Sequence, residues 1–124
     1  MHHKKRKFNE KQAKFIIANI VLALEFVHSN GVIHRDVRPQ NLVFCKDGYL
    51  KLIDFGFARP WMKNNSADTS GTPCYMAPEV LLRQNHTYTS DFFAVGVILH
   101  ELLSGRKPYV GPDRISYKAQ VLKE

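Results

Sequence analysis

The sequence predicts a mainly α-helical domain with a small β-hairpin, an α+β fold. Two apolar segments of helical length, residues 9–30 and 90–105, carry the helical part of this prediction. Two short apolar runs flank the turn-forming residues 46–48 and carry the hairpin. The 124 residues suffice for one domain, and a hydrophobic content of 44% is typical of a globular protein.

The net charge of +7 is concentrated at the N-terminus. Residues 1–14 hold six Lys or Arg and one Glu, so the other 110 residues carry only +2. We therefore expect residues 1–7 to form a basic tail. Its "KKRK" run fits either a nuclear-localisation or phosphate-binding patch or a solvated lead-in to a helix. We favour the lead-in and expect no specific nucleic-acid partner, because no RNA-binding aromatic motif accompanies the run.

Cysteine usage and hydropathy predict the compartment. Cys45 and Cys74 lie far apart and lack metal-site spacing, which favours a reduced intracellular protein, cytoplasmic and/or nuclear. The longest apolar stretch, Phe15–Val27, is interrupted by Asn19 and Glu25. We expect it to be too short and too polar to span a bilayer of about 30 Å, so no membrane partner is predicted.

The first helix is predicted from Asn9 to about Asn30. Apolar residues recur at three- and four-residue steps, Asn9 and Gln12 match a capping pair, and Gly31 matches a C-terminal stop. The next elements are two short strands, Leu42–Phe44 and Tyr49–Ile53, joined by the turn.

The hairpin places two polar residues together. If its turn is centred on Asp47-Gly48, Asn41 and Asp54 are equidistant from it and lie side by side at the open end, with Asp36 just upstream. An amide oxygen and a carboxylate are hard ligands that suit Mg²⁺, which takes few protein ligands. For Asn41 or Asp54 taken alone, a role as a cap or turn residue would be the preferable interpretation.

The remaining chain predicts a long loop and two helices. More than twenty residues after Asp54 show no period, and loops of this length are usually functional or disordered. Residues 90–105, with a cap at Ser90 and a stop at Gly105, are apolar nearly all round, which predicts a helix buried at the centre of the fold. Pro112 is placed to open a last helix.

The stretch "VIHRDVRPQN" places Asp36 beside Arg35 and Arg38. Neighbouring cations favour the charged form of an acid. Asp36 is therefore suited to accept a proton or to orient a hydroxyl group.

Three motifs now carry a family resemblance: "HRDVRPQN" (34–41), "DFG" (54–56) and "GTPCYMAPE" (71–79). In this order they resemble the large, C-terminal lobe of a eukaryotic protein kinase of the serine/threonine type. The resemblance covers residues 8–124 and implies a kinase-like lobe truncated at both ends. Residues 54–79 correspond to the activation segment of that family, and we use this name for them.

The resemblance implies phosphoryl transfer from ATP to Ser or Thr hydroxyls of a protein substrate. It implies that Asp36 orients the substrate hydroxyl and accepts its proton, and that Asn41 and Asp54 hold Mg²⁺. Arg38 stands where such kinases usually carry a lysine near the transferring phosphate. The planar guanidinium group of arginine therefore replaces the compact ammonium group of lysine.

Further residues receive roles by resemblance. Val43 is expected beneath the adenine of ATP, and Thr72 is expected to bridge Asp36 and the substrate-docking loop. His34 is expected to pack in the core rather than to bind a metal. Asp91 is expected to hydrogen-bond the backbone of the segment that we call the catalytic loop, residues 34–41.

The resemblance also implies a regulatory anion beside Arg35, because a buried arginine needs a partner. Asp68 lies four residues before Thr72, where a phosphorylated residue often stands in this family. It either replaces the phosphate or is an ordinary solvated loop residue. Candidate sites for an upstream kinase are Ser66, Thr69 and Ser70.

Several kinase parts are not found in this sequence. Only Gly31 precedes Asp36, so the chain has no glycine-rich phosphate loop, and we expect it to be a fragment in kinase terms. The favoured function is therefore a serine/threonine kinase represented in part. One alternative is a non-catalytic kinase-like interaction or regulatory module. A nucleic-acid binder using "KKRK" is another, whose binding would weaken with salt.

Overall fold

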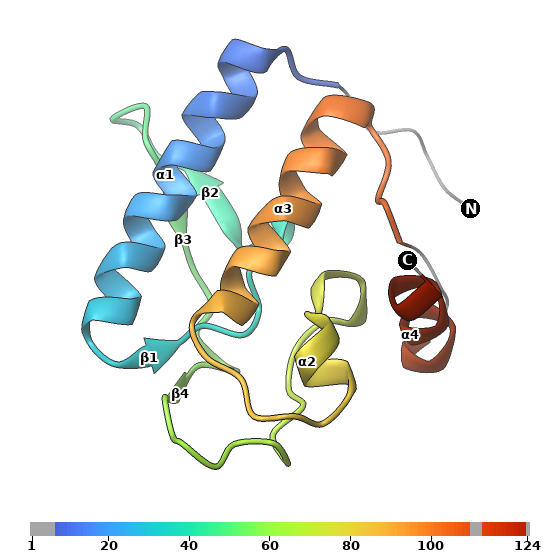
Figure 1. Ribbon diagram of the computed structural model, residues 1–124. Helices are drawn as coiled ribbons and strands as arrows, with labels where there is room; N and C mark the ends of the chain where they lie inside the picture. Colours follow the sequence, from blue (N-terminus) through green and yellow to red (C-terminus); the bar gives the residue numbers. More distant parts are fainter. Residues whose placement is uncertain (1–6, 110–112, 124) are drawn as a thin grey trace.

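The structure is a computed structural model that describes residues 7–109 and 113–123. Two long helices, α1 (Glu10–Ser29) and α3 (Thr89–Ser104), lie side by side, and short strands lie against α1 (Figure 1). The mainly α-helical fold with a small hairpin is confirmed. The other elements in chain order are β1 (Val32–Ile33), η1 (Pro39–Asn41), β2 (Leu42–Phe44), β3 (Leu50–Leu52), β4 (Arg59–Pro60), η2 (Pro73–Tyr75), α2 (Pro78–Leu81) and α4 (Arg114–Lys123).

Helix α1 has the predicted capping box. The Gln12 backbone N–H donates to Asn9 Oδ1 at 2.8 Å, and the Asn9 N–H donates to Gln12 Oε1 at 3.0 Å. These bonds satisfy donors that the first helical turn leaves free. At the other end Gly31 adopts φ +74°, so the chain leaves the helix where the sequence predicts.

Helix α3 differs from its prediction in two ways. It begins at Thr89 rather than after a Ser90 cap, because the Ser90 hydroxyl donates back to the Thr87 carbonyl at 2.9 Å. It is also not buried on every side, since exposed apolar side chains form a stripe along its outer face: Phe92, Leu99 and Leu103. Only its inner face packs against α1. Gly105 ends it as predicted, with φ +77°.

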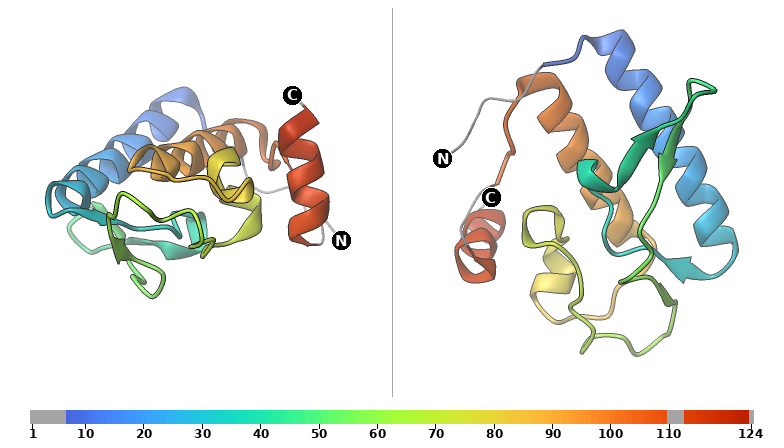
Figure 2. Two further views of the ribbon diagram at one scale, coloured as in Figure 1. Left: turned by 60° about the horizontal axis from the view of Figure 1, so that its bottom comes forward. Right: turned by 180° about the vertical axis from the view of Figure 1, so that it is seen from behind.

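The hairpin forms, but its register differs from the prediction by one residue. Its turn holds three residues, Lys46, Asp47 and Gly48, with Gly48 at φ +86°, so the centre lies at Asp47. Asn41 therefore faces Ile53, whose N–H donates to the Asn41 carbonyl at 2.8 Å. Asp54 lies one residue further along. Seen from behind, the hairpin lies against α1 (Figure 2).

The segment after Asp54 is not a structureless loop. It contains β4, which pairs antiparallel with β1, as well as η2 and the short helix α2. A two-residue strand is too short for alternating apolar residues to reveal it, so the sequence predicted neither β1 nor β4.

The described residues form two hydrophobic clusters. The larger lies between α1, α3 and β3, with Leu24 and Ile98 fully buried. The smaller joins α2 to α4, where the buried Tyr117 hydroxyl donates to the Met76 carbonyl at 2.9 Å. Cys74 packs against both clusters, which places residues 71–79 at their junction.

Three expectations at the ends of the chain have different outcomes. By length and composition alone α1 is long and apolar enough to cross a membrane, contrary to the expectation from Phe15–Val27. The core helix of a soluble protein meets the same criterion, and α1 packs against α3 and β3. Pro112 and most of the basic tail lie outside the described residues, and α4 begins at Arg114.

Candidate functional site

The loop that carries Asp36 is held by a buried carboxylate from α3. Asp91, 2% exposed, accepts the backbone N–H groups of His34 and Arg35, each at 2.9 Å. Arg35 itself adopts φ +74°, a backbone conformation that is costly for a residue with a side chain. His28 of α1 contacts the same carboxylate at 2.8 Å. Asp91 thus fixes a strained turn immediately before Asp36.

Four of the sequence-predicted site residues meet at the Asp36 carboxylate, which is almost fully buried. The Thr72 hydroxyl donates to Oδ1 at 2.6 Å, and Asn41 Nδ2 donates to Oδ2 at 3.1 Å. Arg38 Nε lies 3.4 Å from Oδ1 and forms an ion pair. The carboxylate therefore has a set orientation before any substrate is present.

The His34 ring connects this loop to the segment around Asp54. Its Nδ1 accepts the Asp36 backbone N–H at 3.0 Å, and its Nε2 donates to the Ile53 carbonyl at 3.2 Å. The ring also meets Phe55 edge to face, with 4.7 Å between centroids. Because both ring nitrogens are engaged, His34 has a packing and positioning role, as expected, and not a metal-binding one.

Asp54 does not share this cluster. It adopts φ +57° in an exposed turn, and its Oδ1 accepts the Gly56 N–H at 3.1 Å. Val43, the residue expected beneath adenine, is 41% exposed on β2. The structure therefore brings together Asp36, Arg38, Asn41 and Thr72, with Asp54 and Val43 on open surface.

Asn41 and Asp54 each carry an oxygen donor of the kind that magnesium prefers. Asn41 uses both N–H groups of Nδ2 on Asp36, which leaves Oδ1 as its atom for a cation. Asp54 contributes an exposed carboxylate. Within residues 7–109 and 113–123 no group of three His, Cys, Asp or Glu could hold a metal. Such a donor set suits Mg²⁺, which completes its shell with water and substrate phosphates.

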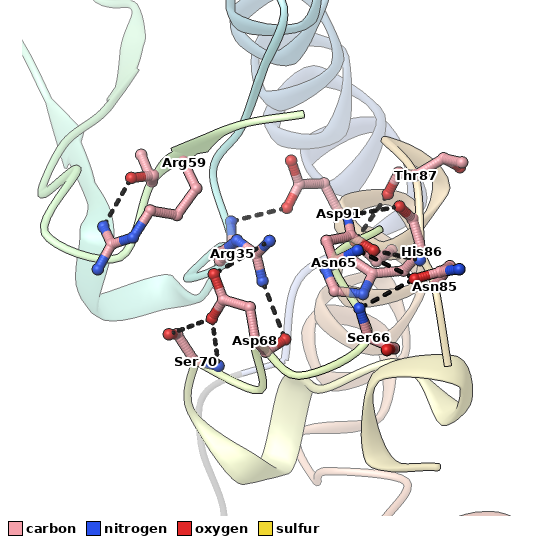
Figure 3. A network of polar contacts seen from close by, with 12 residues as sticks. Arg35, Arg59, Asn65, Ser66, Asp68, Ser70, Asn85, His86, Thr87 and Asp91 are labelled. Carbon is pink, nitrogen blue, oxygen red and sulfur yellow. Dashed lines mark hydrogen bonds and ion pairs between the residues drawn. The ribbon is translucent and has the colours of Figure 1, made fainter. Parts of the chain in front are cut away.

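Arg35 pairs with Asp68 of the activation segment (Figure 3). This contact is expected if Asp68 takes the place of a phosphate, and not if it is an ordinary solvated loop residue. Arg35 Nη2 lies 3.4 Å from Asp68 Oδ2, and Nη1 donates to the Asp68 carbonyl at 3.3 Å. Burial lowers the pKa of the Arg35 guanidinium, and the Asp68 carboxylate partly offsets this. Burial alone would raise the pKa of Asp68, but hydrogen bonds from Ser70 and the charge of Arg35 leave it below its ordinary value.

A pair of asparagines holds the activation segment in a way that the sequence did not reveal. Asn65 Nδ2 donates to the His86 carbonyl, and the His86 N–H donates to Asn65 Oδ1, both at 2.9 Å. Asn85 Oδ1 accepts the N–H groups of Asn65 and Ser66, each at 3.0 Å (Figure 3). We call these contacts the asparagine clamp. Its partners lie about twenty residues apart, so no local pattern announces it.

Two more contacts fix the activation segment further along. Arg114 of α4 donates to Thr69 Oγ1 at 2.9 Å and to the Thr69 carbonyl at 2.8 Å. Gly71 adopts φ +135°, and a Cβ there would lie 2.7 Å from the Arg35 carbonyl oxygen. Only glycine permits this approach. Thr72 is thereby brought to the Asp36 carboxylate.

Comparison with known proteins gives one consistent result. A family model described as "Protein kinase domain" matches residues 1–124. Cyclic-GMP-dependent protein kinase 2 of Rattus norvegicus is 41% identical over 117 residues, covering 94% of this chain and 15% of the relative. The cAMP-dependent protein kinase, catalytic subunit-like, of Caenorhabditis elegans is 40% identical over 106 residues, covering 86% of this chain and 26% of the relative. The chain thus spans about one seventh to one quarter of the length of these relatives.

Proposed function

Because the chain belongs to the protein kinase domain family, we propose that it supplies the catalytic residues of the large, C-terminal lobe of a serine/threonine protein kinase. The reaction is transfer of the γ-phosphoryl group of ATP to a Ser or Thr hydroxyl of a protein substrate. The observation that carries the proposal is the Asp36 carboxylate, which Thr72 and Asn41 orient from two sides. Fixed orientation of this kind is what phosphoryl transfer needs most.

Asp36 acts on the substrate hydroxyl. Its Oδ1 is taken by Thr72 and Arg38, and its Oδ2 shares one hydrogen bond with Asn41. A carboxylate oxygen has two lone pairs, so Oδ2 can accept a further bond from the substrate hydroxyl. Asp36 then aligns that oxygen for attack on the γ-phosphorus and takes its proton as the new bond forms, while the bond from the γ-phosphorus to the β–γ bridging oxygen breaks and ADP leaves.

Arg38 supplies fixed positive charge beside the reacting group. Its guanidinium lies against Asp36 in the free chain and is about a third exposed. The remaining N–H groups of its planar fork are suited to a phosphoryl oxygen, to which they bind in two-point fashion. Arg38 therefore holds the transferring phosphate in line with the hydroxyl that Asp36 orients.

Asn41 and Asp54 would hold Mg²⁺ together with ATP phosphates. When bound, the ion neutralises charge on the β- and γ-phosphates. Val43, exposed on β2, presents an apolar surface for the adenine ring. Thr72 begins the η2 turn at the junction of the two hydrophobic clusters, where a protein substrate would dock beside Asp36.

A non-catalytic interaction module is the second candidate. The exposure of Asp54 and Val43 favours it, because ligand pockets usually bury at least about 70% of a small ligand. The ordered Asp36 cluster favours the kinase, since a binding module needs no carboxylate that Thr72 and Asn41 hold in one orientation.

A chimera tests the proposal. The chain is joined to the small lobe of cyclic-GMP-dependent protein kinase 2, and radiolabelled phosphate transfer and nucleotide binding are measured in parallel. Asp36→Asn should lower transfer at least about 100-fold and leave nucleotide binding unchanged. Asp54→Asn should weaken both.

Asp47→Asn is the matched control, because Asp47 lies in the exposed hairpin turn. It should change neither quantity. An Asp36→Asn chimera that transfers phosphate within a few-fold of its parent would show that the assigned role is wrong, and an inactive parent chimera would favour the interaction module.

A further inference from the structure

A small cavity lies beneath the activation segment, apart from the Asp36 carboxylate. Its polar walls are Arg35, Ser70, His86, Ser90 and Asp91, and the other side chains that line it are Val37, Tyr75, Met76, Ala77, Val80 and Ala94. The volume open to the centre of a water-sized sphere is about 20 Å³. By this measure about 10–15 Å³ is enough for one water molecule.

Arg35 brings a donor to this cavity. Its side chain is 3% exposed, and its two terminal nitrogens face Asp68. Its Nε is a buried atom with no hydrogen-bond partner among the described residues. Burial of a cationic N–H group without a hydrogen-bond acceptor costs free energy, so an acceptor is expected close to Arg35 Nε.

His86 brings an acceptor. Its Nδ1 lies 3.3 Å from the Gln84 carbonyl oxygen, so Nδ1 carries the hydrogen in that contact. In the neutral ring Nε2 is then unprotonated. This Nε2 is buried and also has no hydrogen-bond partner in the described part of the chain. Figure 3 labels His86 and Arg35 among the residues of one network of polar contacts, and both residues line the cavity.

We propose that this cavity is a binding site for one water molecule. The water accepts a hydrogen bond from the Arg35 Nε–H group and donates one to Nε2 of neutral His86. A donor and an acceptor that line one water-sized cavity are the setting in which proteins hold buried water. The water joins the catalytic loop to the segment that leads into α3. It acts beside the asparagine clamp, which holds the backbone of the same histidine.

The site requires neutral His86. Protonation at Nε2 would place a second donor opposite Arg35, and one water could no longer donate to the ring. The charged groups around His86 are Arg35, Asp68 and Glu79, with Asp91 lining the cavity. Burial is the main cause that lowers the pKa of His86, and Arg35 adds to it. The folded chain therefore binds this proton less readily than the unfolded chain, and acid favours unfolding.

A crystal structure of the 124-residue chain at a resolution that shows ordered water tests the site directly. We expect one water at about 2.7–3.2 Å from both Arg35 Nε and His86 Nε2. His86→Phe should lose it, and His100→Phe, which changes an exposed histidine of α3, should retain it. An empty cavity, or a direct bond from Arg35 Nε to a protein acceptor, would overturn the proposal.

The melting temperature at different pH values gives a second test. An unperturbed histidine titrates near pH 6.5, so the parent should lose stability as the pH falls through this value toward the lower folded pKa of His86. This part of the loss should be absent in His86→Phe and unchanged in His100→Phe. His86→Gln, which keeps a polar side chain, replaces the phenylalanine variant if that variant does not fold. Equal pH dependence in parent and both His86 variants would contradict the linkage.

Discussion

At the scale of single residues, the orientation of one carboxylate is the most informative feature of this chain. Thr72 donates to Asp36 Oδ1 across 36 positions of sequence, and the approach of Gly71 to Arg35 makes this possible. The hydroxyl of Thr72 is thus a positioning group for the carboxylate that, in our proposal, acts on the substrate hydroxyl.

Thr72→Val should therefore lower the turnover of the chimeric kinase about ten-fold, because losing one charge-assisted hydrogen bond costs roughly 1–3 kcal/mol. Thr72→Ser keeps the hydroxyl and should retain most of the turnover. Steady-state phosphorylation of a peptide measures both. Equal loss in the valine and serine variants would mean that the methyl group, and not the hydrogen bond, matters.

Asp68→Ala should destabilise the chain by leaving Arg35 without its carboxylate. A fully buried pair that loses one member costs about 3–5 kcal/mol, but Asp68 is 30% exposed, so about 1–3 kcal/mol is expected. Urea denaturation measures the change. Asp47→Ala removes the exposed Asp47–Lys51 pair and should cost less than about 1 kcal/mol.

The same pair makes a pH-dependent contribution. The pKa of Asp68 lies below its ordinary value in the folded chain, so the stabilisation is present at neutral pH and is lost as the pH falls through the folded pKa.

In the chimera, Asp68→Ala should also lower the activity of the unphosphorylated enzyme. Unchanged activity, with phosphate mapped to Ser66, Thr69 or Ser70, would show that Asp68 does not replace a phosphate.

At the scale of elements, the activation segment is held by contacts that involve no phosphate. The asparagine clamp fixes its middle, Arg35 and Arg114 hold residues 68 and 69, and Gly71 closes its end against the catalytic loop. An irregular segment with this many anchored groups behaves as a packed element.

Asn65→Ala tests the clamp. It leaves the buried backbone N–H and carbonyl of His86 without partners, which should lower the free energy of unfolding by about 1–3 kcal/mol. Amide hydrogen exchange around residue 66 should accelerate as well. The neighbouring Asn64 is exposed, so Asn64→Ala should change neither measurement. If both alanine variants behave alike, the clamp does not stabilise the segment.

Replacing Gly71 or Gly96 by alanine should change the stability of the chain in opposite directions. Gly71→Ala puts a Cβ 2.7 Å from the Arg35 carbonyl oxygen at φ +135°, so it should destabilise the chain by at least about 1–3 kcal/mol. Gly96 lies within α3 with no atom near its would-be Cβ, so Gly96→Ala should stabilise by up to about 1 kcal/mol. Thermal denaturation compares the two. A tolerated Gly71→Ala would mean that the catalytic loop can move away from the activation segment.

At the scale of the whole molecule, the described chain leaves much apolar surface uncovered. Phe26 of α1 is 72% exposed and Ile115 of α4 is 81% exposed, and the outer stripe of α3 adds to them. Apolar surface of this extent usually marks an interface or a tendency to aggregate.

The 124-residue chain by itself should therefore bind Mg²⁺-ATP weakly, have no measurable kinase activity and self-associate. In our proposal Asp54, Asn41 and Val43 form only one side of the nucleotide site, and polar contacts on open surface remain weak because water competes for them. Calorimetric titration of Mg²⁺-ATP, a peptide phosphorylation assay and analytical ultracentrifugation check the three statements. Micromolar binding with turnover by a monomer would contradict this account.

Local sequence determined the two long helices, the hairpin and the family. The capping box of Asn9 and Gln12, the Gly48 turn and the Gly105 stop act over a few residues, so they could be predicted, and the three motifs identified the kinase family before any fold was known. A helix end or tight turn depends on neighbours in the chain, and those are visible in a sequence.

Only the tertiary structure decided the register of the hairpin and the anchoring of the activation segment. The third turn residue moved Asp54 away from the position opposite Asn41 by one place, a change that composition does not reveal. The contacts of Asn65 with His86 and of Arg114 with Thr69 join residues about 20 and 45 positions apart. Polar pairs at such separations produce no period in the sequence, because their meeting depends on how the helices pack, and that is settled by the whole core.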